Sequence, residues 1–197
     1  DEPATAQLLT DLAEALASRG HEVTVIASHN GDSEISRTET HHGVRIVRVC
    51  SSRSKKPSLV RKAADFATFT TGALWRLFRL ARRGDVVVAM TDPPLLAIGA
   101  WIVTAWCSAR LVHWVQDIYP ELAIVLSRQR WLQALIPLRN LAWRRAATCA
   151  TLGTDMAGVL TTAGVAPQKI AIIPNWAPAG VTVTSDDGGK ALRAEWG

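Results

Sequence analysis

The sequence predicts an α/β domain of the doubly wound type, and three observations predict it. Segments with helical spacing alternate with short, apolar, β-branched segments along most of the chain. Two of these apolar segments, 85–91 and 110–115, are continuous, as in parallel strands buried on both faces. Polar side chains follow both strands directly, at the position where open α/β sheets bind ligands. We therefore expect a mostly parallel sheet with a binding site at the carboxyl ends of its strands.

The first half of the chain divides into elements separated by glycine or polar residues. We expect a helix over 5–19, a strand over 21–28, a loop over 30–43, a strand near the sheet edge over 44–50, a helix from Ser58 to about 82 and a strand over 85–91. Gly20 ends the first helix as the residue after its C-cap. His41 and His42 lie in the expected loop, and we interpret them as a polar turn rather than a metal site.

The second half continues the alternation. We expect a helix over 95–108, a strand over 110–115, helical segments over 122–126 and 131–145, a strand over 147–152, a helix from Thr154 or Asp155 to about 163, a strand over 169–174 and the start of a helix at 190–196. Pro137 should kink or split the second helical segment. A doubly wound sheet also needs a central strand before the first helix, and we expect that this strand is missing. Residues 1–176 then form the domain, and 177–197 form a linker and the start of a truncated second domain.

Composition excludes several classes of protein. The 197 residues are 48% hydrophobic, which is enough for a sizeable core. The three cysteines have no CxxC spacing, which argues for a reducing compartment and against a disulfide scaffold or a zinc site. The longest apolar run, 95–109, is too short to span a bilayer. The glycine motifs of dinucleotide and P-loop enzymes and the G-x-S-x-G motif of hydrolases are absent.

Positive charge is concentrated in two segments. Residues 53–83 hold nine Lys/Arg and one acid, and residues 128–145 hold five Arg and no acid. The rest of the chain has more acids than bases, although the formal net charge is +5. This segregation indicates an anionic partner surface. The alternative is that the two segments are ordinary solvated helix faces.

The strand over 110–115 organises the candidate site. It ends in Gln116 and Asp117 and continues to Glu121, so polar groups follow a buried strand directly. Thr91 and Asp92 follow the preceding strand in the same way. The alternative is a simple strand-loop-helix junction in which Asp117 caps the next helix.

Four segments carry a resemblance to a known family. These segments are ATAQLLTDLAEALASRGHEVTVIAS, DVVVAMTDPPLLAIGA, RLVHWVQDIYPELAIVL and KIAIIPNWA, and they span nearly the whole chain. The chain resembles the N-terminal domain of family 4 glycosyltransferases, especially the WbuB-like group of bacterial O-antigen and capsule transferases. It departs from them at Asn175-Trp176, where they often have Asn-Gly, and at Thr91-Asp92-Pro93, where a histidine motif is common.

The resemblance implies a GT-B fold, in which two Rossmann-like domains face a cleft. The N-terminal domain holds the acceptor, and the C-terminal domain holds most of the nucleotide-sugar donor. Family members retain the anomeric configuration and need no metal or other cofactor. The residues that this implies are Asp117 as the catalytic group, and Asp1, Glu2, Thr5, Thr91, Asp92, Gln116, Glu121 and Asn175 as substrate-binding groups. Helix capping by Thr5 and plain turns at Asp92 and Asn175 are the alternatives.

The resemblance also gives the basic segments a use. Transferases of this group act on lipid diphosphate-linked sugars at the cytoplasmic face of the membrane, so we expect a cytoplasmic protein that binds the membrane peripherally. Arginine and tryptophan on apolar-faced helices suit an interfacial position. The membrane-contact candidates are Trp75, Arg76, Arg79, Trp131, Arg139 and Trp143. The alternative assigns the tryptophans to the core and the arginines to an ordinary surface. Nucleic acid is not expected, because no basic-aromatic binding motif occurs.

Other functions remain open. This chain is expected to be inactive alone, because the donor half of the enzyme is absent. It would then be an acceptor-binding or membrane-docking fragment. A sugar-nucleotide epimerase shares the two-domain fold, although the QDIYPE and TDPP segments favour glycosyl transfer.

Overall fold

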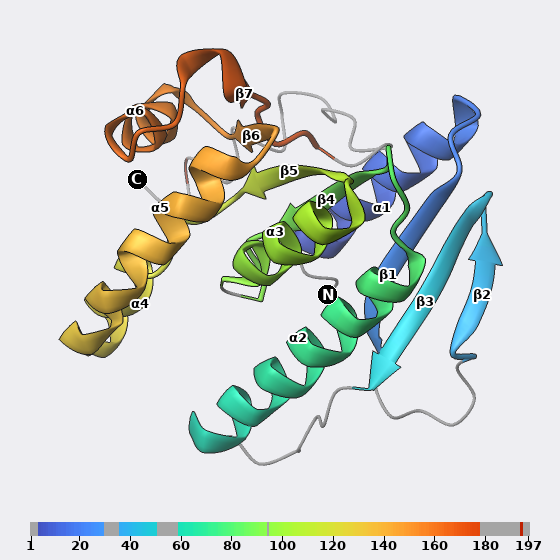
Figure 1. The fold of residues 1–197 in the computed structure, drawn as a ribbon, viewed down its shortest axis with the longest axis horizontal. Helices are drawn as coiled ribbons and strands as arrows, with labels where there is room; N and C mark the ends of the chain where they lie inside the picture. The colour runs from blue at the N-terminus through green and yellow to red at the C-terminus, as the bar shows by residue number, and fades with distance from the viewer. Residues whose placement is uncertain (1–3, 30–35, 51–58, 94, 178–193, 195–197) are drawn as a thin grey trace.

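A computed structural model describes residues 4–29, 36–50, 59–93, 95–177 and 194 (Figure 1). The strands are β1 (Val23–His29), β2 (Thr38–His41), β3 (Val44–Cys50), β4 (Val86–Met90), β5 (Arg110–Val115), β6 (Thr148–Thr151) and β7 (Ile170–Ile172). The helices are α1 (Ala4–Ser18), α2 (Leu59–Leu80), α3 (Leu96–Cys107), α4 (Glu121–Ser127), α5 (Ile136–Arg145) and α6 (Thr154–Thr162), with 3-10 helices η1 (Arg130–Leu135) and η2 (Pro167–Lys169). The alternating α/β architecture is confirmed.

The strands form two hydrogen-bonded sheets. β4, β5, β6 and β7 make a parallel sheet in that order, and β1, β3 and β2 make a second sheet in which only β2 is antiparallel. The expectation that a central strand is missing before α1 stays a prediction. The helix expected at 190–196, the Ser58 cap, and nearly all of 177–197 lie outside the described residues.

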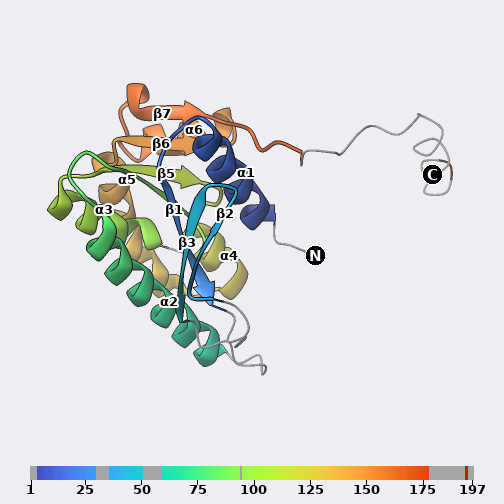
Figure 2. The same cartoon turned by 90° about the vertical axis from the view of Figure 1, so that its right-hand side faces the viewer.

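The four-stranded sheet lies between helices (Figure 2). On one face, Ala89, Leu111, Val115 and Cys149 pack against side chains of α3, α5 and α6. On the other face, Met90, Trp114 and Ala150 pack against Leu8 of α1, with Leu9 and Leu12 beside it. Alternate residues of β5 therefore enter opposite layers, as the pleat of a strand requires.

The interpretation of β4 as a strand buried on both faces is wrong for its first residues. Val86 and Val88 remain 52% and 36% exposed, while Ala89 and Met90 are buried. The α1 side chains in this core pack against Met90, Trp114 and Ala150, and Met90 is the last residue of β4. The buried part of β4 is therefore its carboxyl end, which leads into the candidate site.

The segment expected to be a loop over 30–43 contains strand β2. Its residues, Thr-Glu-Thr-His, are all polar, so they give no hydrophobic alternation that would predict a strand. Pairing with β3 defines the strand, and a two-residue turn at His42 and Gly43 closes the hairpin. Arg48 of β3 reaches across to the Glu39 carboxylate and to the Ser36 carbonyl. β3 consequently lies in the middle of its sheet, and its prediction as a near-edge strand is wrong.

Two local predictions concern helix starts and interruptions. The interruption expected at Pro137 is confirmed, because 3-10 helix η1 ends at Leu135 and α5 begins at Ile136. The cap expected from Thr154 or Asp155 is wrong: Gly153 is the N-cap of α6, and no side chain bonds the cap.

Candidate active site

The Thr91 hydroxyl joins the carboxyl ends of β4 and β5. Thr91 is 6% exposed, and its Oγ1 accepts hydrogen bonds from the backbone N–H groups of Gln116 and Asp117, at 3.2 and 3.3 Å. The backbone of two expected site residues, Gln116 and Asp117, is thereby held by the side chain of a third, Thr91. A buried side chain that accepts two backbone hydrogen bonds orders the loop after β5, because it holds both N–H groups against the end of β4.

Two exposed carboxylates and a tyrosine lie together at this edge. Asp92 and Asp117 are both exposed, and Tyr119 is half-buried. The pKa of Tyr119 is raised by burial and then by the negative charges of Asp117 and Asp92. With its pKa raised, the tyrosine hydroxyl stays protonated at neutral pH and able to donate. A carboxylate pair and a hydroxyl donor can together hold and orient a sugar hydroxyl.

Glu121 is held by a buried arginine behind this edge. Arg139 of α5, 5% exposed, donates two hydrogen bonds to the Glu121 carboxylate at 2.6 and 3.0 Å. The same guanidinium donates to the Tyr119 carbonyl at 2.7 Å and lies 3.8 Å from the centre of the Trp143 ring. We call this set of contacts the Arg139 clamp. It fixes the loop that carries Asp117 and Tyr119 to the helix layer.

The clamp corrects two membrane-contact assignments. Arg139 and Trp143 are 5% and 1% exposed, so neither side chain can reach a lipid surface. Arg139 is buried because it has a carboxylate, a carbonyl and an aromatic ring as partners, which satisfy its charge and donors. The alternative that placed Trp143 in the core is confirmed.

A small cavity lies under the edge, beside the buried side chain of His113. It has a volume of ≈ 10 Å³, about the size of one water molecule. Thr91, Asp117, Tyr119 and Arg139 line it together with His113. Burial and then the charge of Arg139 lower the pKa of His113 to about 3, so the imidazole is neutral at pH 7. The cavity is too small to hold a sugar.

The chain after β7 is fixed to α1. Trp176 stacks on Trp114 of β5, with ring centres 5.7 Å apart, and its Nε1–H donates to Asp11 of α1 at 2.9 Å. The stacking contact and the hydrogen bond give Trp176 a structural role, at a position where the transferases that the sequence resembles often have glycine. Asn175, directly before it, is exposed.

The remaining expected site residues are less closely grouped. Thr5 lies in the first turn of α1 and is half-buried, whereas Asp1 and Glu2 lie outside the described residues. Gln116 Nε2 is buried without a hydrogen-bond partner among the described residues. The sequence did not indicate Tyr119, His113 or the clamp. Alternation along β5 was an available signal for His113, because it lies on the same face as buried Leu111 and Val115.

The basic segment of α2 presents exposed aromatic residues. Trp75 is 59% and Phe78 is 42% exposed, and their rings stack with centres 6.1 Å apart. The guanidinium of Arg79 lies 5.8 Å from the Trp75 ring centre, and Arg76 is exposed beside it. Trp131 in η1 is also exposed, at 66%. In the part of the chain that the structure describes, no helix has both the length and the apolar character needed to cross a bilayer.

A scan of protein families matches residues 5–176 to the family described as "Glycosyl transferase 4-like domain". The match includes every described strand and all the contacts at the carboxyl edge. A search of curated proteins finds no match.

Proposed function

The chain belongs to the glycosyltransferase 4-like family, and on that basis we propose that it is the acceptor-side domain of a retaining glycosyltransferase. The sugar comes from a nucleotide-sugar donor. The acceptor is a lipid diphosphate-linked sugar used in bacterial surface polysaccharide synthesis, as in the WbuB-like group that the sequence resembles.

The carboxyl edge of β4 and β5 is the observation that carries the proposal. Asp92 and Asp117 are exposed there, and the negative charges of both raise the pKa of Tyr119. Acceptor sugars offer hydroxyl groups, which carboxylates bind as hydrogen-bond acceptors. Asp117 has the additional role of orienting the attacking hydroxyl and accepting its proton. Thr91 positions Asp117 through the backbone.

Glu121 has a positioning role in this proposal. Both of its oxygens bond Arg139, although its side chain remains 40% exposed. The roles expected of Asp1, Glu2 and Thr5 at the donor diphosphate, and of Gln116 and Asn175 at the cleft, remain part of the proposal.

Acceptor binding tests the proposed site. A water-soluble, short-chain lipid diphosphate-linked sugar is titrated into the 197-residue chain by calorimetry, and Asp117→Asn is compared with the exposed control Asp155→Asn on α6. We expect binding by the parent and by Asp155→Asn, and weaker binding by Asp117→Asn. Binding of nucleotide-sugars with no binding of the acceptor analogue would overturn the acceptor-side assignment.

Product analysis separates transfer from the alternatives. The chain is incubated with a panel of nucleotide-sugars, with and without acceptor, and the products are separated by chromatography. An interconverted nucleotide-sugar formed without acceptor would indicate an epimerase. A glycosylated acceptor would show that this chain is active alone, which is against expectation. Acceptor binding without turnover supports an acceptor-binding half of the enzyme.

The surface of α2 supports peripheral contact with an anionic membrane at the cytoplasmic face. Trp75, Phe78 and Arg79 lie at helical spacing, so the exposed rings and the guanidinium share one side of the helix. Each arginine near an anionic surface contributes about 1 kcal/mol. Replacing both Arg76 and Arg79 with Ser should therefore weaken binding to anionic vesicles by about 2 kcal/mol, or about 30-fold.

Vesicle sedimentation provides the test, with and without an anionic lipid. Trp75→Ser should weaken binding to both vesicle types, because its ring contributes apolar contact. Arg37→Ser removes one charge before β2 and serves as the control, with a change of much less than 30-fold expected. Negligible binding of the parent to both vesicle types would refute membrane contact through α2.

A further inference from the structure

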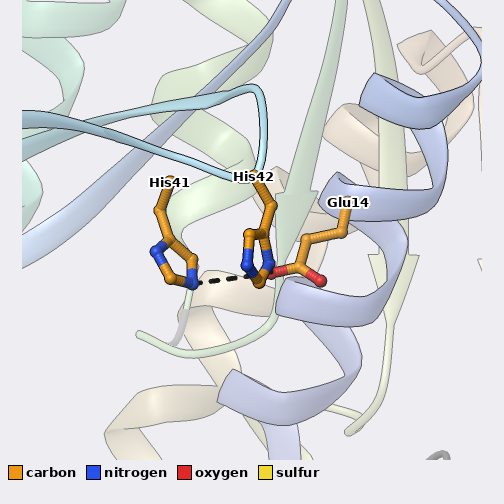
Figure 3. Close-up of side chains that lie close together, drawn as sticks. All are labelled: Glu14, His41 and His42. Carbon is orange, nitrogen blue, oxygen red and sulfur yellow. Dashed lines mark hydrogen bonds and ion pairs between the residues drawn. The ribbon is translucent and has the colours of Figure 1, made fainter.

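A cluster of three metal-ligand side chains lies away from the candidate active site, where α1 meets the β2–β3 hairpin. It consists of Glu14 of α1, His41 at the end of β2 and His42 in the turn (Figure 3). The glutamate is 27 residues before the first histidine, so only the fold brings the three together. The sequence predicts a polar turn here, and His42 lies in a turn. The Glu14 carboxylate beside it adds a third potential metal ligand to the two imidazoles.

The distances suit a single small cation. His42 Nδ1 lies 2.8 Å from Glu14 Oε1, His41 Nε2 lies 4.0 Å from the same oxygen, and all three ligand atoms lie within 4.8 Å of one another. A tetrahedral ion about 2.0–2.1 Å from each ligand would hold neighbouring ligand atoms about 3.3 Å apart. The observed separations lie on both sides of that value, so small side-chain rotations produce the geometry.

The backbone presents both imidazoles to the helix. His42 has a φ of 46° and Gly43 a φ of 79°, the left-handed pair of a two-residue hairpin turn. A Cβ on Gly43 would lie 3.5 Å from Cβ of Ala17, so the turn rests directly on α1, one helical turn beyond Glu14. The two imidazole rings lie with centres 4.0 Å apart and face the same carboxylate.

We propose that Glu14, His41 and His42 form a binding site for a divalent transition-metal ion of the zinc class. Two imidazole nitrogens and one carboxylate oxygen are the ligands that zinc takes, whereas magnesium and calcium prefer oxygen ligands throughout. The side chains are 35%, 61% and 66% exposed for Glu14, His41 and His42, so solvent can supply a fourth ligand. The bound ion links α1 to the hairpin, which without it meet here through the packing of Gly43 beside Ala17, the approach of His41 to Glu14 and the hydrogen bond from His42 to Glu14.

Binding exchanges that hydrogen bond for metal bonds. The carboxylate only accepts, so the His42 Nδ1–H is the donor in the metal-free form. The ion takes the Nδ1 lone pair, and the ring proton moves to Nε2 or to solvent. No bond to carbon changes, and no oxidant is required.

Zinc calorimetry on the untagged 197-residue chain in a non-chelating buffer tests the site. We expect one zinc ion per chain, little competition by magnesium, and a rise in melting temperature that grows with zinc concentration. Glu14→Gln and His42→Asn should each weaken zinc binding by about tenfold or more, because each removes a direct ligand. Asparagine tolerates the left-handed backbone at position 42, so this variant keeps the turn.

Two control variants locate the ion. His21→Gln removes an exposed histidine outside the cluster, and Cys50→Ser removes an exposed thiol. Both should bind zinc like the parent. The proposal is wrong if the parent binds no zinc, if Glu14→Gln and His42→Asn bind as tightly as the parent, or if binding is lost in Cys50→Ser. Imidazole nitrogen shifts of His41 and His42 on zinc addition provide a second readout that does not depend on stability.

Discussion

The Arg139 clamp allows a prediction about which partner of an ion pair is more costly to remove. Arg139 is 5% exposed, whereas the Glu121 side chain is 40% exposed. Removing the arginine leaves a carboxylate that water can reach. Removing the glutamate leaves a buried cation whose remaining acceptors are the Tyr119 carbonyl and the Asn140 side chain. The second change should therefore destabilise the fold more.

The magnitudes follow from these partners. Arg139→Met keeps the apolar stem over Trp143 but removes the charged hydrogen bonds, which are worth about 1.5–3 kcal/mol each when buried. Because Glu121 is partly solvated, we expect a total loss of about 2–3 kcal/mol. Glu121→Leu should cost about 3–5 kcal/mol, as expected when a buried charge loses its partner. The double variant should lose about 1–3 kcal/mol less than the sum of the single losses.

Equilibrium urea unfolding of the four proteins measures these free energies. Arg145→Met, an exposed change on the same helix, is the control and should stay within about 0.5 kcal/mol of the parent. The reasoning is refuted if Arg139→Met costs as much as Glu121→Leu, or if the two losses simply add.

Three further changes test other parts of the fold. His113 has a pKa of about 3 in the folded protein and about 6.5 in the unfolded chain, so between these pH values only the unfolded chain binds a proton at this residue. The free energy of unfolding is therefore unaffected by His113 above pH 6.5, and it falls by up to about 1.4 kcal/mol per pH unit below it. His113→Phe should flatten the curve of stability against pH below pH 6.5, as measured by urea unfolding. An unchanged slope would show that His113 is not held neutral in the folded protein. Thr91→Val should cost about 1–3 kcal/mol by leaving two N–H groups without their acceptor, with Thr91→Ser restoring most of the loss; equal losses in both would show that the hydroxyl is unimportant. Gly99→Ala gains about 1 kcal/mol of helix propensity but places a Cβ 2.3 Å from Leu74 Cδ1, so we expect a net loss of about 1–2 kcal/mol and a lower melting temperature; a stabilised variant would show that α2 and α3 readjust freely.

Hydrophobic periodicity predicted most elements because it reports burial directly. β5 is located at the expected residues because its apolar run ends at Val115, and Pro137 lies where the helix divides. β2 could not be predicted in this way, because an exposed polar strand is defined by its partner. Hydrophobic periodicity within one segment also does not show which distant residues pair with each other.

The candidate site shows the same division. Thr91, Asp92 and Asp117 could be selected because polar residues follow buried strands, and the structure brings them to one edge. The sequence predicts a membrane contact for Arg139, because it lies in a basic segment that also carries Trp131 and Trp143, whereas the structure buries it. Its partner Glu121 is 18 residues away in sequence, and a pairing between residues this far apart is not visible in the local pattern that would show which arginine is buried.

The division of the strands into two hydrogen-bonded sheets has a consequence for cooperativity. Among the described residues, no backbone ladder joins β1 to β4, so the two sheets are coupled by the side chains of α1 and α2. Strands joined by a backbone ladder tend to open as a unit, and coupling of two sheets through helix side chains allows one unit to open before the other. Amide protons of β1 and β3 should therefore exchange with a free energy different from those of β5 and β6. The described strands then form two units, with helices α1 and α2 as the links between them.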